Sequence, residues 1–400
     1  MPWHISNPME QKAEFVLKAI ATDNFRRLCR DYGISAKTGY KWKERFMAEG
    51  LAGLVEESRR PQSHSEELGE QVVCEMVRLK QRHPHWGPAK VQELYARSHG
   101  AGRTPSLSSF KRVLERAGLV QKRRTRAASS GGRLHSGRRA QAPNEVWSVD
   151  FKGWWHDPQG QRCEPLTVRD EHSRYLLDCH RMDSARTEAV WERFERLFER
   201  HGLPEAIRSD NGVPFASVNG VLGLSKLSAR WVALGIGLER SRPGCPQDNG
   251  AHERMHRDMS IELQHSPQGW RQAGLDAWRE QFNHQRPHQA LGMKTPAELY
   301  THSALRYRGL PQDLEYPGMT QTRRINHRGN IIWSQQPIFI SSALAGWSVG
   351  LQPRSDRLLD LYFASLLLGQ VEPTTFSFQR AASGPLEAET PTPYSVTTTP

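Results

Sequence analysis

Three carboxylates, Asp150, Asp210 and Glu253, stand in short segments of different local character. Asp150 lies in an alternating apolar and polar run, Asp210 follows a short apolar run and precedes Asn-Gly, and Glu253 lies in an expected first turn of a helix. Carboxylate oxygens suit Mg²⁺, which keeps coordination positions for water and phosphate. Two such ions about 3.5–4 Å apart can activate an attacking oxygen and stabilise a leaving one. If the segments meet, the pattern predicts metal-dependent phosphodiester chemistry.

Taken singly, each of these acids has an ordinary explanation. Asp-Asn-Gly is a common turn, and acids often stand at the start of a helix, where the helix dipole favours them. Two other acids compete for a place in such a site: Asp248, in the loop before the last helix, and Asp170, which fits better as a turn residue. The order of the three segments, taken together, favours the catalytic interpretation.

The central region, residues 143–305, is expected to form the mixed α/β domain that brings the acids together. Trp147 and Val149 alternate with Ser148 and Asp150, so a strand here directs Asp150 to the face opposite its apolar residues. The first three strands are expected to form an antiparallel meander. Apolar spacing and terminal glycines give the further elements. In chain order these are strands at 165–168 and 175–179, a helix at 187–201, a strand at 206–210, a helix at 228–234, a strand at 236–239 and a helix from about 249 to 263.

The last of these helices is expected to present Glu253 away from the core. Its apolar stripe is formed by Ala251, Met255, Met259 and Leu263. Glu253 lies roughly opposite that stripe at about 100° per residue. Its place in the first turn, near the positive end of the helix dipole, suits a carboxylate.

The N-terminal residues 1–60 are expected to form a helix-turn-helix module. Apolar spacing over 9–30 predicts helix, Gly33 marks a turn, and Ser35 is placed to cap a second helix. This arrangement is typical of DNA-binding helix-turn-helix units. The side chains expected to face outward toward DNA are Lys37, Thr38, Tyr40 and Lys41.

Residues 61–121 are expected to form a second helix-turn-helix or winged-helix module, with helices near 72–79, 90–97 and 106–117. His83 and His85 lie between its first two helices. No cysteine or further histidine is spaced near them as a metal ligand, so a loop role is expected.

The composition points to a polyanionic partner. Lysine and arginine number 55 against 43 acids in 400 residues, for a formal net charge of +12. Such an excess favours binding to phosphates, because each phosphate that is neutralised releases counterions. A basic surface that is simply solvated would have the same composition. Residues 122–142 carry Lys122, Arg123 and Arg124 among Ser, Gly and Ala with no acid, and they are expected to form a flexible linker that lies along a DNA backbone.

Two further features of the sequence indicate where in the cell the protein is expected to work. The five cysteines are scattered, with no Cys-x-x-Cys pair, so we expect reduced thiols without a disulfide framework or zinc site. The N-terminus lacks an apolar signal core, and no segment has the length of a membrane span. A soluble cytoplasmic protein is expected.

These motifs resemble those of DDE transposases with a retroviral-integrase-type catalytic core, most closely the bacterial insertion-sequence group IS481. The similarity covers most of the first 300 residues, because the N-terminal helix-turn-helix also resembles the family. The segments that carry it in the core are 147–152, 166–175, 208–215, 242–244, 247–257, 282–292 and 294–299.

The resemblance implies a multidomain protein with all-α helix-turn-helix modules, an α/β RNase H-like catalytic core and a small all-β SH3-like C-terminal domain. It implies that Asp150, Asp210 and Glu253 are catalytic and bind two Mg²⁺ or Mn²⁺ ions. Arg254 and Arg257, with His256, match residues that approach DNA ends in relatives. The implied reaction is hydrolysis at the 3′ ends of terminal inverted repeats, followed by attack of the freed 3′-hydroxyl on target DNA.

The implied partners are double-stranded DNA, as element ends and as target, and further copies of the chain in a homo-oligomer at the bacterial nucleoid. One departure from the family concerns Glu253. The 42 residues between Asp210 and Glu253 make a longer interval than is usual, and we expect residues 219–227 to loop out the excess.

Residues 306–370 are expected to form the small all-β domain. A basic hairpin at 323–333 and strands at 337–340, 348–351 and 358–363 suit a five-stranded SH3-like barrel, which resembles the DNA-binding domain of integrases. A plain β module for assembly fits the same pattern. Residues 371–400 are rich in Pro, Thr and Ser, and we expect disorder there.

Two other functions fit parts of the pattern. One is a helix-turn-helix DNA-binding regulator with an inactive core, which the intact carboxylates disfavour. The other is a nuclease of the RNase H class that acts on RNA–DNA hybrids. Two DNA-reading modules disfavour the nuclease, because a hybrid nuclease has no need for them.

Overall fold

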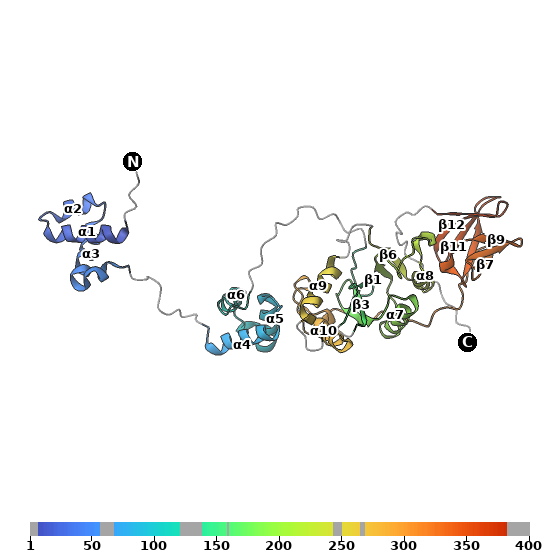
Figure 1. Cartoon of the computed structure of the whole chain (residues 1–400), viewed down its shortest axis with the longest axis horizontal. Helices are drawn as coiled ribbons and strands as arrows, with labels where there is room; N and C mark the ends of the chain where they lie inside the picture. Colours follow the sequence, from blue (N-terminus) through green and yellow to red (C-terminus); the bar gives the residue numbers. More distant parts are fainter. Residues whose placement is uncertain are drawn as a thin grey trace. The chain divides into compact units, whose positions relative to one another are not determined.

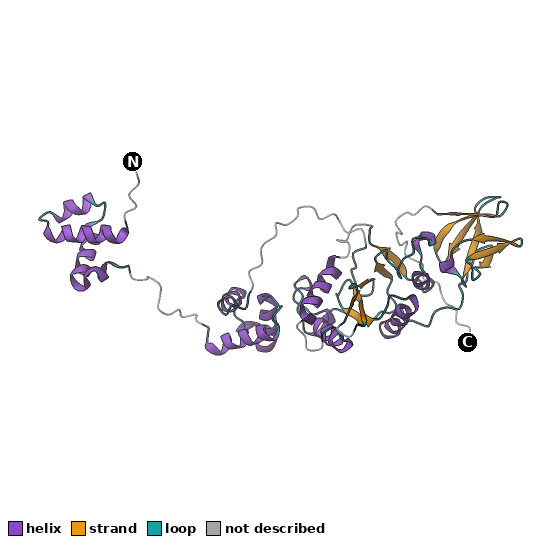
Figure 2. Ribbon diagram, viewed as in Figure 1, coloured by secondary structure: helices purple, strands orange, loops and turns teal. Residues whose placement is uncertain are grey.

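The computed structural model describes residues 7–56, 68–120, 138–157, 160–242, 250–264 and 269–381. Contacts within the chain divide it into two compact units, Met1–Glu70 and Gln71–Pro400. Along the chain, helices come first, a mixed α/β region follows, and strands come last (Figure 1, Figure 2). Some predictions lie outside the described residues: those for Lys122, Arg123, Arg124 and Asp248, and that for the tail beyond residue 381.

The described part of the N-terminal unit consists of α1 (Pro8–Ala21), α2 (Phe25–Asp31), α3 (Ala36–Glu49) and the 3₁₀ turn η1 (Gly50–Leu54). The predicted Ser35 cap is confirmed, since its side chain accepts a hydrogen bond from the backbone N–H of Thr38. Gly33 has a φ of +65° in the turn before α3, a conformation that favours glycine. The predicted helix over 9–30 is two helices, because Asn24 caps a new one.

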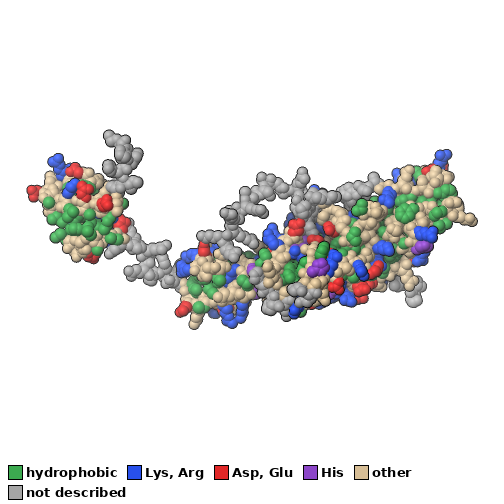
Figure 3. Space-filling view, viewed as in Figure 1, with side chains coloured by type: hydrophobic (Ala, Val, Ile, Leu, Met, Phe, Trp, Pro, Cys, Tyr) green, Lys and Arg blue, Asp and Glu red, His purple; other side chains and the backbone are tan. Residues whose placement is uncertain are grey.

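Aromatic side chains fill the core of this unit, with Phe15 of α1 and Trp42 of α3 packed around Cys29. Large apolar side chains also stay on its surface, where Figure 3 shows them gathered together. The most exposed of them in this unit are Leu17, Tyr40, Met47, Leu51 and Val55.

Gly39 allows α3 to approach its neighbours closely. A Cβ at this position would lie 2.7 Å from Sγ of Cys29 and 3.0 Å from ring atoms of Phe15 and Phe25. We therefore expect Gly39→Ala to destabilise the N-terminal unit by about 1–3 kcal/mol, although alanine has the higher helix propensity. Urea unfolding of the full chain measures this. Gly102→Ala, which adds a Cβ in open space, is the control, and an unchanged or higher midpoint for Gly39→Ala would contradict the packing argument.

The second helical module consists of α4 (Glu70–Arg82), α5 (Pro88–His99) and α6 (Leu107–Arg116), which confirms the three predicted helices. Ser106 caps α6 by accepting from the backbone N–H of Ser109. Phe110 and Leu114 of this helix are fully buried. His83 stacks on Trp86 with ring centroids 4.0 Å apart, so this imidazole has a packing role in the loop.

The central region contains a six-stranded sheet in the part of the chain that the structure describes. Its strands are β1 (Val146–Phe151), β2 (Trp155–His156), β3 (Arg162–Asp170), β4 (Leu176–Met182), β5 (Ala206–Ser209) and β6 (Gly237–Arg240). Strand β3 pairs antiparallel with β1 and β4, as predicted, whereas β5 and β6 continue from β1 in parallel. The spatial order β4-β3-β1-β5-β6, with the first three strands antiparallel, is an RNase H-like order. The short strand β2 was not predicted.

Helices cover both faces of this sheet (Figure 1). Helices α7 (Thr187–His201) and α8 (Lys226–Ala233) pack on the face of Trp147 and Val149. Helices α9 (Gly250–Gln264) and α10 (Gln272–His284) share a second apolar cluster with Leu176 and Cys179 of β4. The apolar alternation in β1 therefore directs Ser148 and Asp150 toward α9.

The long interval before Glu253 contains a closed loop. Ala216 and Leu224 form an isolated antiparallel bridge, and the backbone N–H of Ser217 donates to the carbonyl of Gly223 at 3.0 Å. Residues 217–223 thus form a loop whose two ends are hydrogen-bonded to each other. This excursion overlaps the stretch that was expected to loop out.

The C-terminal region is strand-rich, with β7 (Gln321–Arg324), β8 (Asn330–Trp333), β9 (Gln336–Phe339), β10 (Ser348–Pro353), β11 (Leu359–Phe363), β12 (Leu366–Glu372) and β13 (Ser377–Arg380). Five of these strands form an antiparallel sheet in the order β13-β12-β11-β10-β7. Among the described residues no strand pairing joins β7 to β13, but β8 contacts β7 and β9 contacts β13. The β8–β9 hairpin therefore bridges the two edges of the sheet.

Two predictions for this region are wrong. The basic hairpin over 323–333 does not form, because β7 pairs with β10 and β8 pairs with β9. Ser334 and Gln335 both have positive φ and make the tight turn of that second hairpin. The disorder expected from residue 371 is also wrong for 371–380, where β12 ends and β13 follows, because Val371 is buried and Phe378 packs against the core.

The C-terminal strands share one apolar cluster with the central sheet. Arg380 of β13 also donates to the backbone carbonyl of Asn219 at 3.2 Å. Among the described helices, none combines the length and the apolar character that a membrane crossing needs.

Candidate active site

Asp150 and Asp210 lie at the same level of two neighbouring parallel strands. Strands β1 and β5 pair with Val146 opposite Ala206 and Ser148 opposite Arg208. Extending this register by two residues sets Asp210 opposite Asp150 on the same face. Adjacent strands lie about 4.8 Å apart. The sheet therefore brings these two predicted carboxylates together.

Local structure fixes Asp210 at the end of its strand. Strand β5 ends at Ser209, and Oδ1 of Asp210 accepts a hydrogen bond from the backbone N–H of Gly212 at 3.1 Å. This is an Asx-type turn, in which a short acidic side chain closes onto its own backbone. Asn211 beside it donates to the carbonyl of Ser241 at 2.7 Å.

Glu253 comes to the site from α9. It lies exposed in the first turn of the helix, as predicted, whereas Met255, Met259 and Leu263 are buried. The expected apolar stripe is wrong at Ala251, which is exposed. His252 and His256 are buried on that side of the helix, because hydroxyl groups of the sheet satisfy their ring nitrogens.

Asp150 interacts electrostatically with the other two candidate carboxylates. Burial, followed by the negative charges of Asp210 and Glu253, raises the pKa of Asp150 from 3.8 to about 7. The backbone N–H of Phe151 and the charge of Lys152 act in the opposite direction but do not cancel this effect. Asp150 is thus a half-buried carboxylate near two like charges, and Nδ1 of the neutral His256 lies 3.8 Å from its Oδ2.

Other acids near the sheet are neutralised by arginine. Asp178 accepts two hydrogen bonds from the guanidinium of Arg193, at 3.0 and 2.9 Å. Glu171 is ion-paired with Arg169 and lies 3.8 Å from Arg208. Burial opposes the ionisation of Glu171, but the charge of Arg169, a hydrogen bond from Ser148 and the charge of Arg208 outweigh it, and its pKa falls to about 2. The pKa of Asp150 is raised by burial and by its two acidic neighbours, whereas that of Glu171 is lowered by its arginines and by Ser148. This difference distinguishes Asp150, Asp210 and Glu253 from the other acids near the sheet.

This donor set fits a divalent cation. Mg²⁺ and Mn²⁺ prefer carboxylate oxygens, and a cation would offset both the burial and the repulsion that raise the pKa of Asp150. Among the described residues, no group of three His, Cys, Asp or Glu side chains is already gathered tightly enough to enclose a metal ion. Asp150, Asp210 and Glu253 would supply the ligands from two strand ends and one helix.

Polar contacts between α9 and the sheet were not predicted from the sequence. Nε2 of His252 lies 2.6 Å and Nε2 of His256 lies 2.7 Å from the hydroxyl of Thr167 in β3. Nδ1 of His252 also lies 3.0 Å from the hydroxyl of Ser148 in β1. Burial is the main cause that lowers the pKa of both imidazoles, that of His256 to about 3, so both are neutral at physiological pH.

One sequence signal was available for this arrangement. Residues 252–256 read His-Glu-Arg-Met-His, the spacing at which two histidines share one face of a helix. In zinc proteases this spacing binds metal. Here the shared face turns inward, and Thr167 occupies the position between the two rings.

Asp170, the other competing acid, has a structural role, as its turn position indicated. It is fully buried, and its carboxylate accepts hydrogen bonds from the backbone N–H groups of Asn144 and Ser173, both at 2.7 Å, and from the Ser173 hydroxyl. Its two oxygens join the start of β1 to the turn after β3.

Asp170→Ala is expected to lower the free energy of unfolding by roughly 3 kcal/mol, because buried donors lose their acceptor at about 1–3 kcal/mol each. Thermal unfolding of the full chain measures the loss. Asp183→Ala, at an exposed position between β4 and α7, is the control and is expected to change little. A similar small change for Asp170→Ala would exclude the structural role.

The residues predicted to contact DNA differ in their surroundings. Lys37, Tyr40 and Lys41 are exposed on α3. Thr38 is half-buried. Its hydroxyl lies 2.8 Å from that of Ser35, so Thr38 takes part in the helix cap. Arg254 and Arg257 are exposed on α9. Their contacts with DNA stay predictions.

One further arginine lies near Arg254. Arg174, in the turn after β3, is half-buried and has a φ of +62°. Burial, and then the charges of Arg169 and Arg254, lower its pKa, while Glu171 acts in the opposite direction. Arg174 therefore adds to the positive charge around Arg254.

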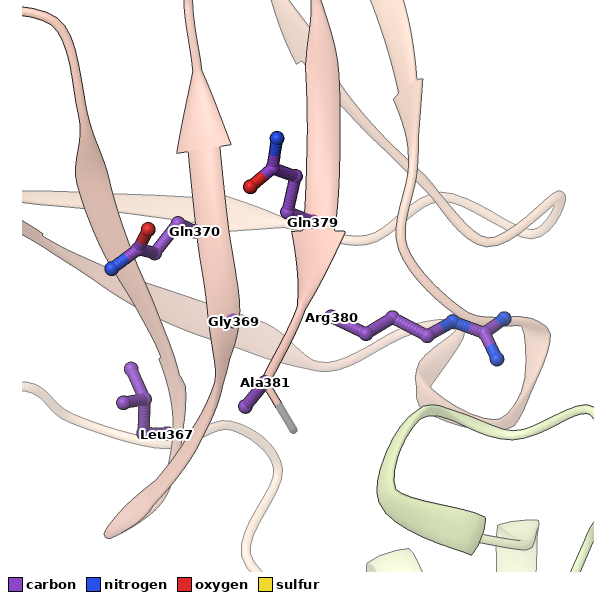
Figure 4. Close-up of a pocket in the computed structure, with 6 residues that line it drawn as sticks. All are labelled: Leu367, Gly369, Gln370, Gln379, Arg380 and Ala381. Carbon is purple, nitrogen blue, oxygen red and sulfur yellow. The ribbon is translucent and has the colours of Figure 1, made fainter. Parts of the chain in front are cut away.

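A surface hollow on the C-terminal strands is separate from these carboxylates. Figure 4 shows it at the β12–β13 edge, with the long side chain of Arg380 directed away from Gly369. Its lining consists of Leu367, Gly369, Gln370, Gln379, Arg380 and Ala381. None of the three candidate catalytic acids belongs to this lining.

Comparison with known domains finds helix-turn-helix matches before integrase-core matches along the chain. Residues 140–246 and 234–296 match two models described as integrase core domain. Residues 11–62 match a helix-turn-helix domain, and residues 38–114 match a homeodomain-like domain. The integrase-core matches include all three candidate carboxylates between them.

Similar proteins occur in bacterial mobile elements. The chain is 26% identical over 255 residues to an uncharacterized 31.7 kDa protein of insertion element IS407 from Burkholderia multivorans, covering 62% of this chain and 87% of that protein. It is 26% identical over 255 residues to an uncharacterized 39.2 kDa protein of IS476 from Xanthomonas euvesicatoria, covering 62% and 70%. The transposase of transposon Tn552 from Staphylococcus aureus is 22% identical over 254 residues, covering 58% and 51%.

Solved structures with some likeness include viral integrases. The magnesium complex of the HTLV-2 integrase catalytic core domain aligns with a TM-score of 0.31 and 14% identity, covering 41% of this chain and all of that one. A simian T-cell lymphotropic virus intasome structure aligns with a TM-score of 0.36 and 18% identity, covering 73% and 97%. Both similarities are weak.

Proposed function

We propose that this protein is a DNA transposase, because residues 140–296 match integrase-core models and the chain is similar to proteins of two insertion elements. It binds the terminal inverted repeats of its element and cleaves their 3′ ends by metal-dependent hydrolysis. It then joins those ends to target DNA by strand transfer. The observation that carries the proposal is that Asp150, Asp210 and Glu253, from three separate segments, lie close enough to interact. Besides burial, the charges of Asp210 and Glu253 contribute to the raised pKa of Asp150.

Each carboxylate has a distinct support in this proposal. Asp150 is held within a central strand, Asp210 by its Asx-type turn and Glu253 by the first turn of α9. Two bound divalent ions would supply an activated oxygen nucleophile and charge stabilisation at phosphorus. The protein then needs no covalent nucleophile of its own, and the buried cysteines take no part.

Basic residues would hold the DNA beside these acids. Arg254 and Arg257 project from the helix that carries Glu253, and phosphate oxygens are the usual ligands of exposed arginines. The helical modules before the core would bind duplex DNA, in keeping with the net charge of +12. Paired element ends would be held by a homo-oligomer of the chain.

A cleavage assay on duplex DNA tests the proposal. The substrate carries the gene's own flanking sequence, and Mg²⁺ or Mn²⁺ is added to the full chain. Metal-dependent nicks at a repeat boundary are expected. Duplex binding without any nick would favour a regulator with an inactive core, and faster cutting of an RNA–DNA hybrid would favour a nuclease of the RNase H class.

A further inference from the structure

One hydroxyl joins the first turn of α9 to the sheet. His252 and His256, one turn apart on this helix, are 0% and 7% exposed. Their Nε2 atoms lie 2.6 and 2.7 Å from Oγ1 of Thr167. The same oxygen lies 3.1 Å from the backbone carbonyl oxygen of Asp150, which is the residue opposite Thr167 in β1.

Counting protons gives this cluster one consistent pattern. A threonine hydroxyl has one proton and two lone pairs. Because the Asp150 carbonyl can only accept, Thr167 donates to it, and the two lone pairs accept from the Nε2–H groups of His252 and His256. The hydroxyl of Ser148 lies 3.0 Å from Nδ1 of His252 and 3.5 Å from the carbonyl oxygen of Arg169. Every hydrogen-bonding position of the Thr167 hydroxyl is used.

We propose that Thr167 positions the glutamate helix against Asp150, with His252 and His256 as its partners on that helix. This rests on the proposed function, since it concerns the same carboxylates. Met259 and Leu263 pack α9 on the sheet further along, but apolar contacts have no preferred direction. The hydrogen bonds from His252 and His256 fix the rotation of the helix about its axis and its position along that axis. Rotation and position together determine where the exposed Glu253 side chain lies.

Thr167→Val is the variant that removes this hydroxyl while keeping the branched shape of the side chain. It leaves two buried imidazole N–H groups without their acceptor, so the first turn of α9 is expected to shift or loosen. Residues that orient metal ligands typically change metal affinity by about 10–100-fold. We expect a weakening of Mn²⁺ binding in this range, and a loss of cleavage rate on the order of 10²-fold. Thr167→Ser keeps the hydroxyl and is expected to retain both properties.

The test measures Mn²⁺ binding to the full chain without DNA, by electron paramagnetic resonance. Ser228→Ala is the matched control, because Ser228 is another fully buried hydroxyl, which belongs to the capping box of α8, a helix on the other face of the sheet. Both Thr167→Val and Ser228→Ala are expected to lower thermal stability. Only Thr167→Val is expected to weaken Mn²⁺ binding and to speed hydrogen exchange in residues 250–256.

The outcomes separate the two proposals. Wild-type Mn²⁺ affinity in Thr167→Val, or equal weakening in Thr167→Ser or in Ser228→Ala, would overturn the positioning role and leave the transposase proposal intact. Absence of Mn²⁺ binding by the wild-type chain would instead overturn the metal site itself. Weakened binding confined to Thr167→Val, with rescue by serine, is the expected result.

Discussion

Asp210→Asn is expected to abolish metal-dependent DNA cleavage and to leave DNA binding unchanged. The substitution keeps the shape of the side chain and can keep the Asx-type turn, since the amide oxygen still accepts from Gly212. It removes one of the negative charges that hold the cations. Loss of a single group that stabilises charge in a transition state costs about 10²–10³-fold in rate, and a metal ligand is expected to cost at least as much.

Single-turnover cleavage of an element-end duplex and fluorescence anisotropy with the same duplex measure the two properties separately. Glu192→Gln removes an equal charge at an exposed position on α7, which packs on the other face of the sheet, and it is expected to behave as wild type. Cleavage by Asp210→Asn within a few-fold of wild type would remove Asp210 from the site. Joint loss of cleavage and binding would indicate misfolding.

Asp150→Asn is expected to stabilise the metal-free protein at pH 8. Because the pKa of Asp150 is raised in the folded chain, from 3.8 to about 7, the folded state binds this proton more tightly than the unfolded state. That contribution to stability is complete below pH 3.8 and is lost as the pH rises through about 7. At about 1.4 kcal/mol per pKa unit, removing the charge is expected to increase the free energy of unfolding at pH 8 by on the order of 2–4 kcal/mol.

Chelator-treated protein, unfolded thermally from pH 4 to pH 8, gives the comparison. The difference between Asp150→Asn and wild type is expected to grow with pH. Added Mg²⁺ at pH 8 is expected to raise the unfolding temperature of the wild type and to leave that of Asp150→Asn unchanged. A variant that is less stable than wild type at pH 8 without metal would contradict the electrostatic account.

Much of the central domain follows from local sequence signals. The helix over 187–201 was predicted residue for residue, because Val190, Phe194 and Leu197 repeat at helical spacing and Gly202 ends the run. The strand at Asp150 was predicted from simple alternation. Asp150, Asp210 and Glu253 were singled out from the sequence as one group. The register between β1 and β5 explains why Asp150 and Asp210 lie together, and the charge of Glu253 acts on Asp150 from α9.

The features that were missed depend on contacts between distant segments. No local pattern reveals that Thr167 accepts from two histidines some 90 residues later, because a histidine on an inward helix face reads as a break in the apolar stripe. The wrong hairpin at 323–333 has a similar cause. Strand β7 pairs with β10 across the intervening hairpin, and sequence proximity favoured the nearer strand.

Two glycines also show that contacts between distant segments are hidden from local sequence patterns. Gly39 reads as a mild defect in a helix, whereas the structure shows three side chains that a Cβ would meet. Gly33, in contrast, was identified from the sequence alone, because its place between two helical runs already indicated a turn.

The most direct test of the central claim is a strand-transfer reaction with a labelled element end and a supercoiled plasmid, in Mg²⁺. The account predicts covalent joints between the 3′ end of the element and plasmid DNA, read by sequencing across the junctions. These joints are expected to disappear in Asp150→Asn, Asp210→Asn and Glu253→Gln alike. Joints formed at wild-type level by any of these three variants, or none formed by a wild-type chain that binds the end and cuts hybrids, would contradict it.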